Sequence, residues 1–409
     1  MGPTVTMAIK NAPHVGSDRG PWLFLALQVV VLALFAAAGV AGSREFLRPP
    51  QLPELREEPL TIRPRYDCPD VVTDEQLRRV VLRLRPRLDG KKTLLANVDH
   101  ALRCWEATAE FKEPEFVSGA ELRRLLVDHR RFAELYGPAE PALLIDKGPG
   151  VAVRTKEGLA TSSHTDHTVA CLAEVGTPLS FPVVTPERET TYRALVEQTL
   201  REFNLFQEEY EWSANVSVLF LPPTTQWRAT DGQQLSFDRL AQRIMRDPWR
   251  RGVCWGQHRL FGLVCFLRVD EQIPILSPDT RERVYQFLNE ATQRLVADQH
   301  ADGFWNDDWS RAKPATVEPS KRDGDQLGDR LLVTGHVLEW WALAPQEVQP
   351  PRKVLVAAAQ WLVRTVEALP EQELQQNYAF LSHAARALAL WRGCEPVKVL
   401  EESRVDAGG

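Results

Sequence analysis

The sequence predicts an all-α protein, an (α/α)6 toroid of six outer and six inner helices, preceded by an N-terminal transmembrane helix and an extended linker. Three observations support this fold. From Val71 onward, amphipathic segments alternate with more uniformly apolar ones. A histidine recurs near the start of five of the apolar segments. One uncharged run, long enough at about 20 residues to cross a bilayer as a helix, precedes them all.

Composition limits the classes of function. The chain has 409 residues, 44% hydrophobic and 25% charged, as in a globular protein with room for a large core. The net charge is −6 and the basic residues form no run, so we expect no nucleic-acid partner. The six cysteines lie far apart without a C-x-x-C pair, which is not the spacing of a structural zinc site. We therefore expect no metal and no cofactor.

The N-terminal region divides into three parts. Residues 1–20 are polar and irregular, and we expect them to be disordered. Residues 21–42 carry no charged side chain and predict a transmembrane anchor, although the small residues Gly39-Val40-Ala41 also suit a cleaved signal peptide. Residues 43–70 are rich in proline and charge, which is typical of an extended linker. The hypothesis is a single-pass membrane protein with an extracytoplasmic soluble domain.

Two sets of six segments predict the helices of this soluble domain. Amphipathic segments with one polar face predict the outer helices at 73–86, 119–136, 189–204, 236–246, 279–299 and 352–369. Segments that are apolar on most sides predict the inner helices at 97–107, 164–176, 210–221, 256–267, 334–344 and 381–391. The domain extends over residues 71–394, and residues 395–409 are expected to form a disordered tail.

Two connections between these helices are long. Residues 141–161 contain two short apolar runs around Gly148-Pro149-Gly150, which predict a hairpin or a lobed loop. Residues 306–330 are charged and poor in apolar side chains, which predicts a flexible loop or lid.

The inner segments share a position near their N-terminal ends. It holds, in chain order, His100, His167, Trp212, His258, His336 and His383. Three of the spacings are 45, 46 and 47 residues, the length of one helix pair, so the chain contains an internal repeat. Three residues later stand Arg103, Ala170, Asn215, Phe261, Glu339 and Arg386. Four of these six residues are polar, and residues three apart share a helix face, so this position predicts a wet central cavity.

One motif carries a family resemblance. Gln299, Asp302, Gly303 and Trp305 form Q-x-x-D-G-x-W between an outer and an inner segment. This order resembles a repeat of the squalene-cyclase and prenyltransferase-like α/α-toroids. The resemblance implies that Gln299 and Trp305 join the end of the outer helix to the start of the inner one. The acidic D-x-D-D signature of the cyclases is absent, since Asn306-Asp307-Asp308 lacks its first acid, and the Asp/Cys/His zinc set of the prenyltransferases has no counterpart.

The recurring histidines permit two interpretations. In toroids of this class the inner helices are parallel, so the five histidines would meet at one mouth, where His167, Asp166 and Glu339 are candidates for acid/base catalysis. The alternative is a packing device repeated with the unit. His164 and His167 could hold a metal from one helix turn, but the sequence identifies no acidic partner. The candidate ligand-binding residues are His100, His167, His258, His336, His383, Trp212, Arg103 and Arg386.

Three functions follow from these observations. The first is a membrane-anchored toroid that binds a polar or glycan-like ligand in its central cavity. One form of this hypothesis adds that the protein also processes that ligand. The second is a non-catalytic scaffold for a protein partner. The third is an isoprenoid or terpenoid cyclase-like enzyme. The sequence does not decide whether the protein is an enzyme.

Overall fold

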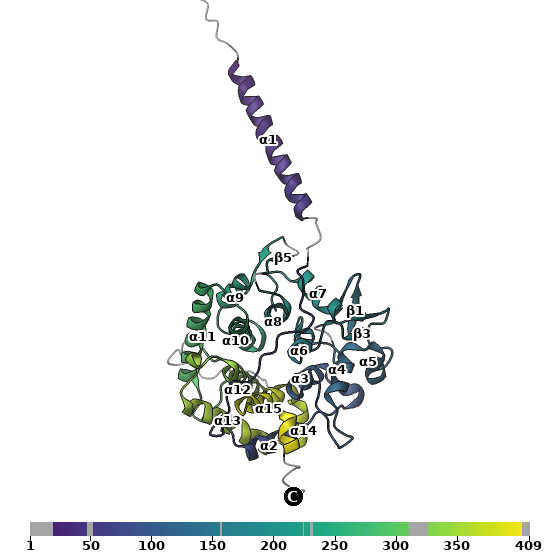
Figure 1. Cartoon of the computed structure of the whole chain (residues 1–409), viewed down its shortest axis with the longest axis vertical. Helices are drawn as coiled ribbons and strands as arrows, with labels where there is room; N and C mark the ends of the chain where they lie inside the picture. Colours follow the sequence, from purple (N-terminus) through teal and green to yellow (C-terminus); the bar gives the residue numbers. More distant parts are fainter. Residues whose placement is uncertain are drawn as a thin grey trace, which may run out of the picture. The chain divides into compact units, whose positions relative to one another are not determined.

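A computed structural model describes residues 19–46, 52–155, 158–223, 225–229, 232–310 and 326–402. The protein is mostly helical, with 58% of its residues in helices, which confirms the helical class predicted from the sequence (Figure 1). The described strands form three short antiparallel hairpins. These pair β1 (Leu144–Lys147) with β2 (Gly150–Val153), β3 (Pro182–Val184) with β4 (Glu189–Thr191), and β5 (Trp227–Arg228) with β6 (Gln234–Leu235).

The chain divides into two units, residues 1–49 and 50–409. The described residues of the first form one helix, α1 (Arg19–Phe46). Its segment Trp22–Val40 is long and apolar enough to cross a membrane, and the side chains described there are exposed. This agrees with the predicted apolar helix by length and composition, features that a signal sequence near the N-terminus shares.

Six inner helices of the second unit pack in a closed cycle. They are α3 (Leu95–Trp105), α6 (His167–Glu174), α8 (Glu211–Phe220), α10 (Gln257–Gln272), α12 (Gln326–Leu343) and α15 (Tyr378–Trp391). Each packs against the next in chain order, and α15 returns to pack against α3 (Figure 1). Each overlaps one of the six segments predicted to be inner helices.

The amphipathic segments form helices that pack on the inner ones. They are α2 (Asp74–Arg83), α4 (Gly119–Val127), α7 (Arg193–Glu202), α9 (Phe237–Arg246), α11 (Pro278–Asp298) and α13 (Arg352–Ala368). Each contacts at least one inner helix adjacent in the chain or, for α2, α15. The predicted helix 119–136 is divided because Asp128 accepts a hydrogen bond from the Arg130 N–H and so caps a new helix, α5 (His129–Tyr136).

Short elements complete the unit. They are the 3₁₀ turns η1 (Gly90–Lys92), η2 (Val253–Gly256) and η3 (Gln346–Val348), and the helices α14 (Glu371–Gln376) and α16 (Pro396–Glu402). Residues 396–402 were expected in a disordered tail, and the structure differs there because Val397 and Leu400 are buried where α16 packs on α2 and α15. The expected hairpin at 141–161 contains β1 and β2.

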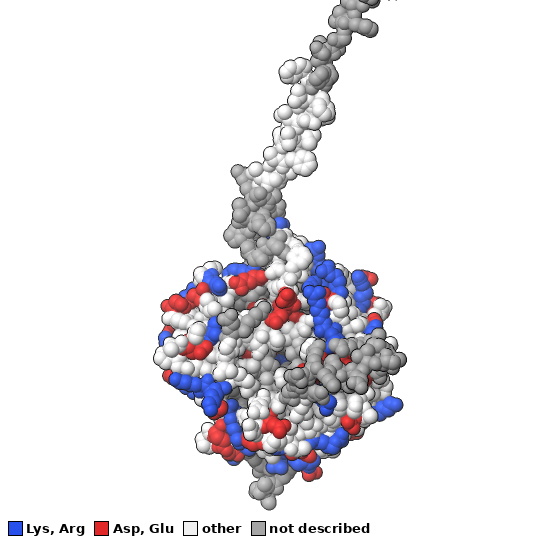
Figure 2. All heavy atoms as spheres, turned by 180° about the vertical axis from the view of Figure 1, so that it is seen from behind, with Lys and Arg blue, Asp and Glu red and all other residues white. Residues whose placement is uncertain are grey.

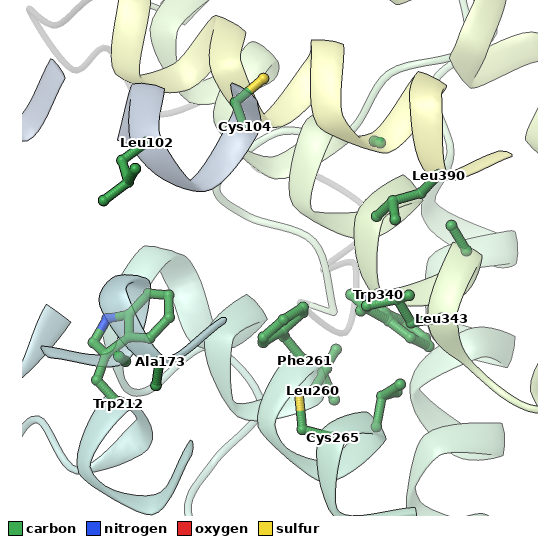
Figure 3. Close-up of a cluster of buried hydrophobic side chains, with 14 of the residues drawn as sticks. Leu102, Cys104, Ala173, Trp212, Leu260, Phe261, Cys265, Trp340, Leu343 and Leu390 are labelled. Carbon is green, nitrogen blue, oxygen red and sulfur yellow. The ribbon is translucent and has the colours of Figure 1, made fainter. Parts of the chain in front are cut away.

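Inner and outer helices differ in which faces they bury. All ten residues of α8 are buried, whereas α9 buries only Phe237, Leu240, Ala241 and Ile244. Figure 3 shows the resulting apolar cluster between the inner helices, with Leu102, Ala173, Trp212, Phe261, Trp340 and Leu390 each coming from a different one. At about 1.5–3 kcal/mol for each large apolar side chain fully buried, this packing is the main stabilising term.

The expected linker contains a stretch that docks on the helical unit. The backbone N–H groups of Arg56 and Leu60 donate to the carbonyls of Phe220 and Leu219, at the end of α8. The Tyr66 hydroxyl donates to the carbonyl of Ala344, just beyond α12, at 2.7 Å. The last carbonyls of a helix have no partner within it, so an extended chain can supply the missing donors. Residues 52–70 therefore cross the C-terminal ends of inner helices.

Some predicted features lie outside the described residues. These are residues 1–18 of the expected disordered N-terminus, residues 403–409 of the expected tail, and residues 311–325 of the expected loop or lid. Residues 326–330, at the end of that predicted loop, begin α12. On the face shown in Figure 2, the described acidic and basic residues lie interspersed, so this face presents both signs of charge.

Candidate functional site

The histidines and the tryptophan that recur in the sequence meet in space. Their side chains form a closed cycle, which we call the axial ring. Neighbouring ring centroids are 4.6 Å apart for His100–His167, 4.5 Å for His167–Trp212, 4.3 Å for Trp212–His258, 4.3 Å for His258–His336, 3.7 Å for His336–His383 and 5.0 Å for His383–His100. Residues spread over 284 positions of the chain thus form one layer, with one residue from each inner helix.

The axial ring fills the space between the inner helices. His100, 8% exposed, is its most accessible member, and the others are 2% exposed or less. Its closest pair depends on Gly335, because a Cβ there would lie 3.0 Å from the Cβ of His383. Helices α12 and α15 can therefore approach closely, and His336 and His383 come into contact.

Asp99 holds the first two histidines of the ring. Its Oδ1 lies 2.9 Å from Nδ1 of His100, and its Oδ2 lies 3.0 Å from Nδ1 of His167. His100 Nδ1 also lies 2.6 Å from the Ala96 carbonyl, and Nε2 of His167 lies 3.4 Å from Sγ of Cys171. Burial alone would raise the pKa of Asp99, but its interactions with His167 and His100 outweigh burial and lower it.

Glu339 holds the last two histidines in the same way. Its Oε2 lies 3.0 Å from Nδ1 of His383 and 3.4 Å from Nδ1 of His336. Burial opposes ionisation of this carboxyl, yet Arg103 and Arg386 hold its pKa well below the usual range. An ionised carboxylate only accepts hydrogen bonds, so each Nδ1 carries the proton and each Nε2 keeps a lone pair. Burial lowers the pKa of both histidines and favours this neutral form.

Four charged residues form a second layer beside the ring. Arg103 contacts Glu174 at 2.8 Å and Glu339 at 2.6 Å, and Arg386 contacts the same two carboxylates. Glu339 thus pairs with both arginines that the sequence placed on its level. Sequence reasoning missed Glu174, although it stands seven residues, or two helical turns, after His167 and so shares its face.

Cys254 was also missed by sequence reasoning. Its Sγ lies 3.2 Å from Nε2 of His258, four residues later. Cys254 and Trp255 both have positive φ, 50° and 57°, which is uncommon for residues with side chains. The following Gly256 has φ 81°, and a Cβ there would lie 2.0 Å from the Trp249 carbonyl oxygen. This strained turn directs the thiol toward the axial ring, and spacing alone gave no sign of it.

Several buried polar atoms of the two layers have no hydrogen-bond partner among the described residues. They are Nη2 of Arg103, Oε1 of Glu174, Nε1 of Trp212, Nδ1 of His258, Nε2 of His336 and Nε2 of His383. Four of the six belong to the consecutive ring members Trp212, His258, His336 and His383. A buried polar group without a partner costs about 1–3 kcal/mol, so this concentration calls for a functional explanation.

The sequence suggested an acid/base pair of Asp166 and His167, which the structure does not form. Asp166 accepts hydrogen bonds from Thr199 at 2.9 Å and Ser213 at 2.5 Å, whereas His167 turns to Asp99. The reason is that Asp166, with φ 59°, lies just before α6 and points away from the ring. Burial raises the pKa of Asp166 and lowers that of His167 to about 4.

The residues of the family-like motif lie between α11 and α12. Gln299 donates to the carbonyls of Gly303 and Val354, both at 2.9 Å. The indole of Trp305 donates to the Leu295 carbonyl at 2.8 Å, and its backbone N–H donates to Thr334 at 3.1 Å. Asp302 is exposed. The buried Trp305 therefore joins α11 to α12.

Three groups of side chains place potential metal-ligand atoms within 4.8 Å of one another among the described residues. They are Cys254, His258 and His336; Asp99, His100 and His167; and His336, Glu339 and His383. All three include members of the axial ring. His164, the other candidate raised by the sequence, instead lies 3.4 Å from Glu209.

Comparison with known proteins adds no family to this description. No model of a known protein family, no curated protein and no solved structure matches the chain. The axial ring and the layer of charges beside it are therefore the features of the molecule that bear on its function.

Proposed function

We propose that the protein is a membrane-tethered (α/α)6 toroid that binds a small polar ligand at its axial ring. The cyclic packing of α3, α6, α8, α10, α12 and α15, with an amphipathic helix between consecutive members, supports this architecture. Trp305 of the motif supports it further by bonding Leu295 of α11 and Thr334 of α12, whereas Gln299 donates to Gly303 and to Val354 of α13 rather than to α12.

One observation carries the ligand-binding proposal. The arc from Trp212 through His258 and His336 to His383 carries four buried polar nitrogens without a partner among the described residues. A ring that served packing alone would be more stable with apolar side chains at these positions, because each unpaired group costs free energy. A ligand that satisfies these nitrogens removes the cost.

The ligand is small because the ring leaves little room. Neighbouring side chains of the arc are 3.7–4.3 Å apart between ring centroids, which is packing contact. A sugar chain would have to separate the inner helices to enter at this level. We therefore favour a ligand of a few atoms over the glycan that the sequence also allowed.

Native mass spectrometry of the full-length protein in mild detergent tests this proposal. The wild-type chain should carry an additional mass that is lost on denaturation. His383→Phe, which removes one unpaired nitrogen while keeping an aromatic ring, should lose that mass. His300→Phe is the matched control, since His300 is exposed and stacks on Phe304 outside the ring. A wild-type protein that carries only its own mass would contradict the proposal.

The second candidate is a scaffold for a protein partner. The buried side chains of the axial ring favour this alternative. Because they occupy the space between the inner helices, a partner would have to bind the outer surface of the protein. Under this alternative, His383→Phe would raise or leave unchanged the melting temperature, and no ligand mass would be found. The cyclase-like alternative has less support, because Asp307 pairs with Arg250 and Asp308 is exposed, so neither acid lies in the axial ring.

The membrane attachment in this proposal has its own test. If residues 22–41 remain as an anchor, alkaline carbonate extraction should leave the full-length protein in the membrane pellet. The physical reason is that this uncharged and exposed helix is long enough to span the hydrocarbon core of a bilayer. Release into the supernatant with an N-terminus at Gly42 or Ser43 would instead identify a cleaved signal peptide.

A further inference from the structure

We propose that Cys254, His258 and His336 bind a transition-metal ion of the zinc type. This inference goes beyond the proposed function, because the ion would be held by Cys254, His258 and His336 and would leave the unpaired nitrogens of Trp212 and His383 to the polar ligand. It departs from the sequence-based expectation of no metal. The reason is that the three residues come from a 3₁₀ turn and two helices that only the fold brings together.

The distances suit such an ion. One potential ligand atom from each of the three residues lies within 4.8 Å of the other two, and Sγ of Cys254 lies 3.2 Å from Nε2 of His258. Zinc bonds of about 2.3 Å to sulfur and about 2.0–2.1 Å to nitrogen place neighbouring tetrahedral ligands roughly 3.3–3.6 Å apart. The Cys254–His258 pair is already near this spacing, so small side-chain movements would complete the set.

His336 is prepared to act as a ligand. Its Nδ1 faces Glu339 at 3.4 Å, while its Nε2 is buried and has no partner among the described residues. A carboxylate behind a histidine fixes the tautomer and orients the ring, and this pairing is usual behind metal-bound imidazoles. Glu339 is therefore a positioning residue for His336.

The other two groups are less suited to a metal. In the group of Asp99, His100 and His167, Asp99 already accepts hydrogen bonds from both histidines, so its oxygens are occupied. In the group of His336, Glu339 and His383, the oxygens of Glu339 are already held by Arg103 and Arg386. The Cys254 group instead offers a sulfur and an unpaired imidazole nitrogen.

The ligand types select the class of ion. One thiolate with two imidazoles favours zinc and other soft or borderline transition metals over magnesium or calcium. Three protein ligands would leave the fourth tetrahedral position open, as in catalytic rather than structural zinc sites. Cys254 is partly exposed, whereas His258 and His336 are buried.

Cobalt(II) chloride is the first probe. The full-length protein in detergent is freed of metal with a chelator and titrated. We expect one ion per chain and the charge-transfer absorption of a cobalt–thiolate bond. Cys254→Ser should abolish that absorption, and His336→Gln should weaken binding by at least about tenfold, the lower end of the loss seen even for residues behind a ligand. Cys265→Ser is the matched control, a buried cysteine of α10 outside the group.

A second measurement on the wild-type chain does not depend on the folding of any variant. Zinc chloride should slow the alkylation of Cys254, followed by peptide mass mapping. It should leave Cys394, the other partly exposed cysteine among the described residues, unchanged. Equal alkylation of Cys254 with and without zinc, or a cobalt–thiolate absorption that survives Cys254→Ser, would overturn the inference.

These results also separate this inference from the proposed function. A chain that binds no cobalt but carries an organic mass sensitive to His383→Phe would refute the metal and keep the ligand site. A chain with neither metal nor organic mass would refute both.

Discussion

Asp99 and Glu339, the two carboxylates that contact the axial ring, each lie against the Nδ1 atoms of two histidines. The two pairs of histidines differ in whether their Nε2 atoms have a partner. Asp99 bonds Nδ1 of His100 and His167, and Glu339 faces Nδ1 of His336 and His383. On the Asp99 side, His167 Nε2 is also in contact with Cys171. On the Glu339 side, both Nε2 atoms are buried and unpaired among the described residues.

The charges behind the two carboxylates also differ. Two arginines pair with Glu339, whereas the polar contacts of Asp99 come from His100, His167 and Thr168. A satisfied network rigidifies a core, while a partly satisfied one costs stability unless something completes it. On this comparison, our proposal assigns an architectural role to the Asp99 side and ligand binding to the Glu339 side.

Removing each carboxylate in turn should give the largest difference in the free energy of unfolding between the Asp99 side and the Glu339 side. Glu339→Gln leaves Arg103 and Arg386 with Glu174 as their shared carboxylate, and breaking such a buried pair costs about 3–5 kcal/mol. Asp99→Asn loses charge-assisted bonds to His100 and His167, for which we expect about 1.5–3 kcal/mol. Denaturant unfolding followed by circular dichroism measures both. Equal losses would show that the arginines do not distinguish the two sides.

Trp305→Ala should lower the stability of the protein by loosening the packing of α12 against α11. Trp305 joins α11 to α12, the helix that carries His336 and Glu339, and truncating a buried tryptophan costs about 3–5 kcal/mol. The exposed motif residue provides the control, since Asp302→Ala should change stability by no more than about 0.5 kcal/mol. An unchanged melting temperature for Trp305→Ala would remove the motif's structural role.

Acid should destabilise the protein through its buried histidines. Burial lowers the pKa of His167 from 6.5 to about 4, so between these pH values the unfolded chain binds the proton and the folded one does not. Stability is therefore full above pH 6.5 and falls as the pH drops toward 4. The difference of 2.5 units corresponds to about 3 kcal/mol at about 1.4 kcal/mol per unit.

His167→Asn isolates this contribution. The free energy of unfolding of the variant should lose about 3 kcal/mol less than that of the wild type between pH 6.5 and 4. Glu106 acts in the opposite direction, because burial raises its pKa to about 7, but it contributes equally to both proteins and cancels in the difference. Parallel curves for the two proteins would mean that His167 titrates normally.

The two cysteines that contact the ring should show the smallest effect on stability. Cys171→Ala removes the contact with His167 Nε2, and we expect a loss of about 1 kcal/mol with no change in cobalt binding. Cys254→Ala should change stability by a similar amount without metal but abolish the cobalt–thiolate absorption. Thermal unfolding and cobalt titration of both variants make the comparison. Loss of cobalt binding in Cys171→Ala would assign the metal to the Asp99 side.

The sequence by itself determined the helical class and the place of most helices. Hydrophobic period is a local property, so twelve helical segments were visible without the fold, whereas the division of 119–136 and the helices α14 and α16 were not. The recurrence of His100, His167, Trp212, His258, His336 and His383 was visible for the same reason, because one repeat position becomes one level of a cyclic array. Helix geometry placed Glu339, Arg103 and Arg386 at equivalent positions three residues beyond ring members, and the structure pairs the carboxylate with both arginines.

Only the tertiary structure decided which atoms meet across that array. Asp99 rather than Asp166 faces His167, because the direction of a side chain at a helix start depends on its φ and ψ. Cys254 reaches His258 through a turn with positive φ that no spacing rule predicts. Hydrogen-bond partners from distant helices decide which ring nitrogens remain unpaired, and such long-range contacts leave no periodic trace in the sequence.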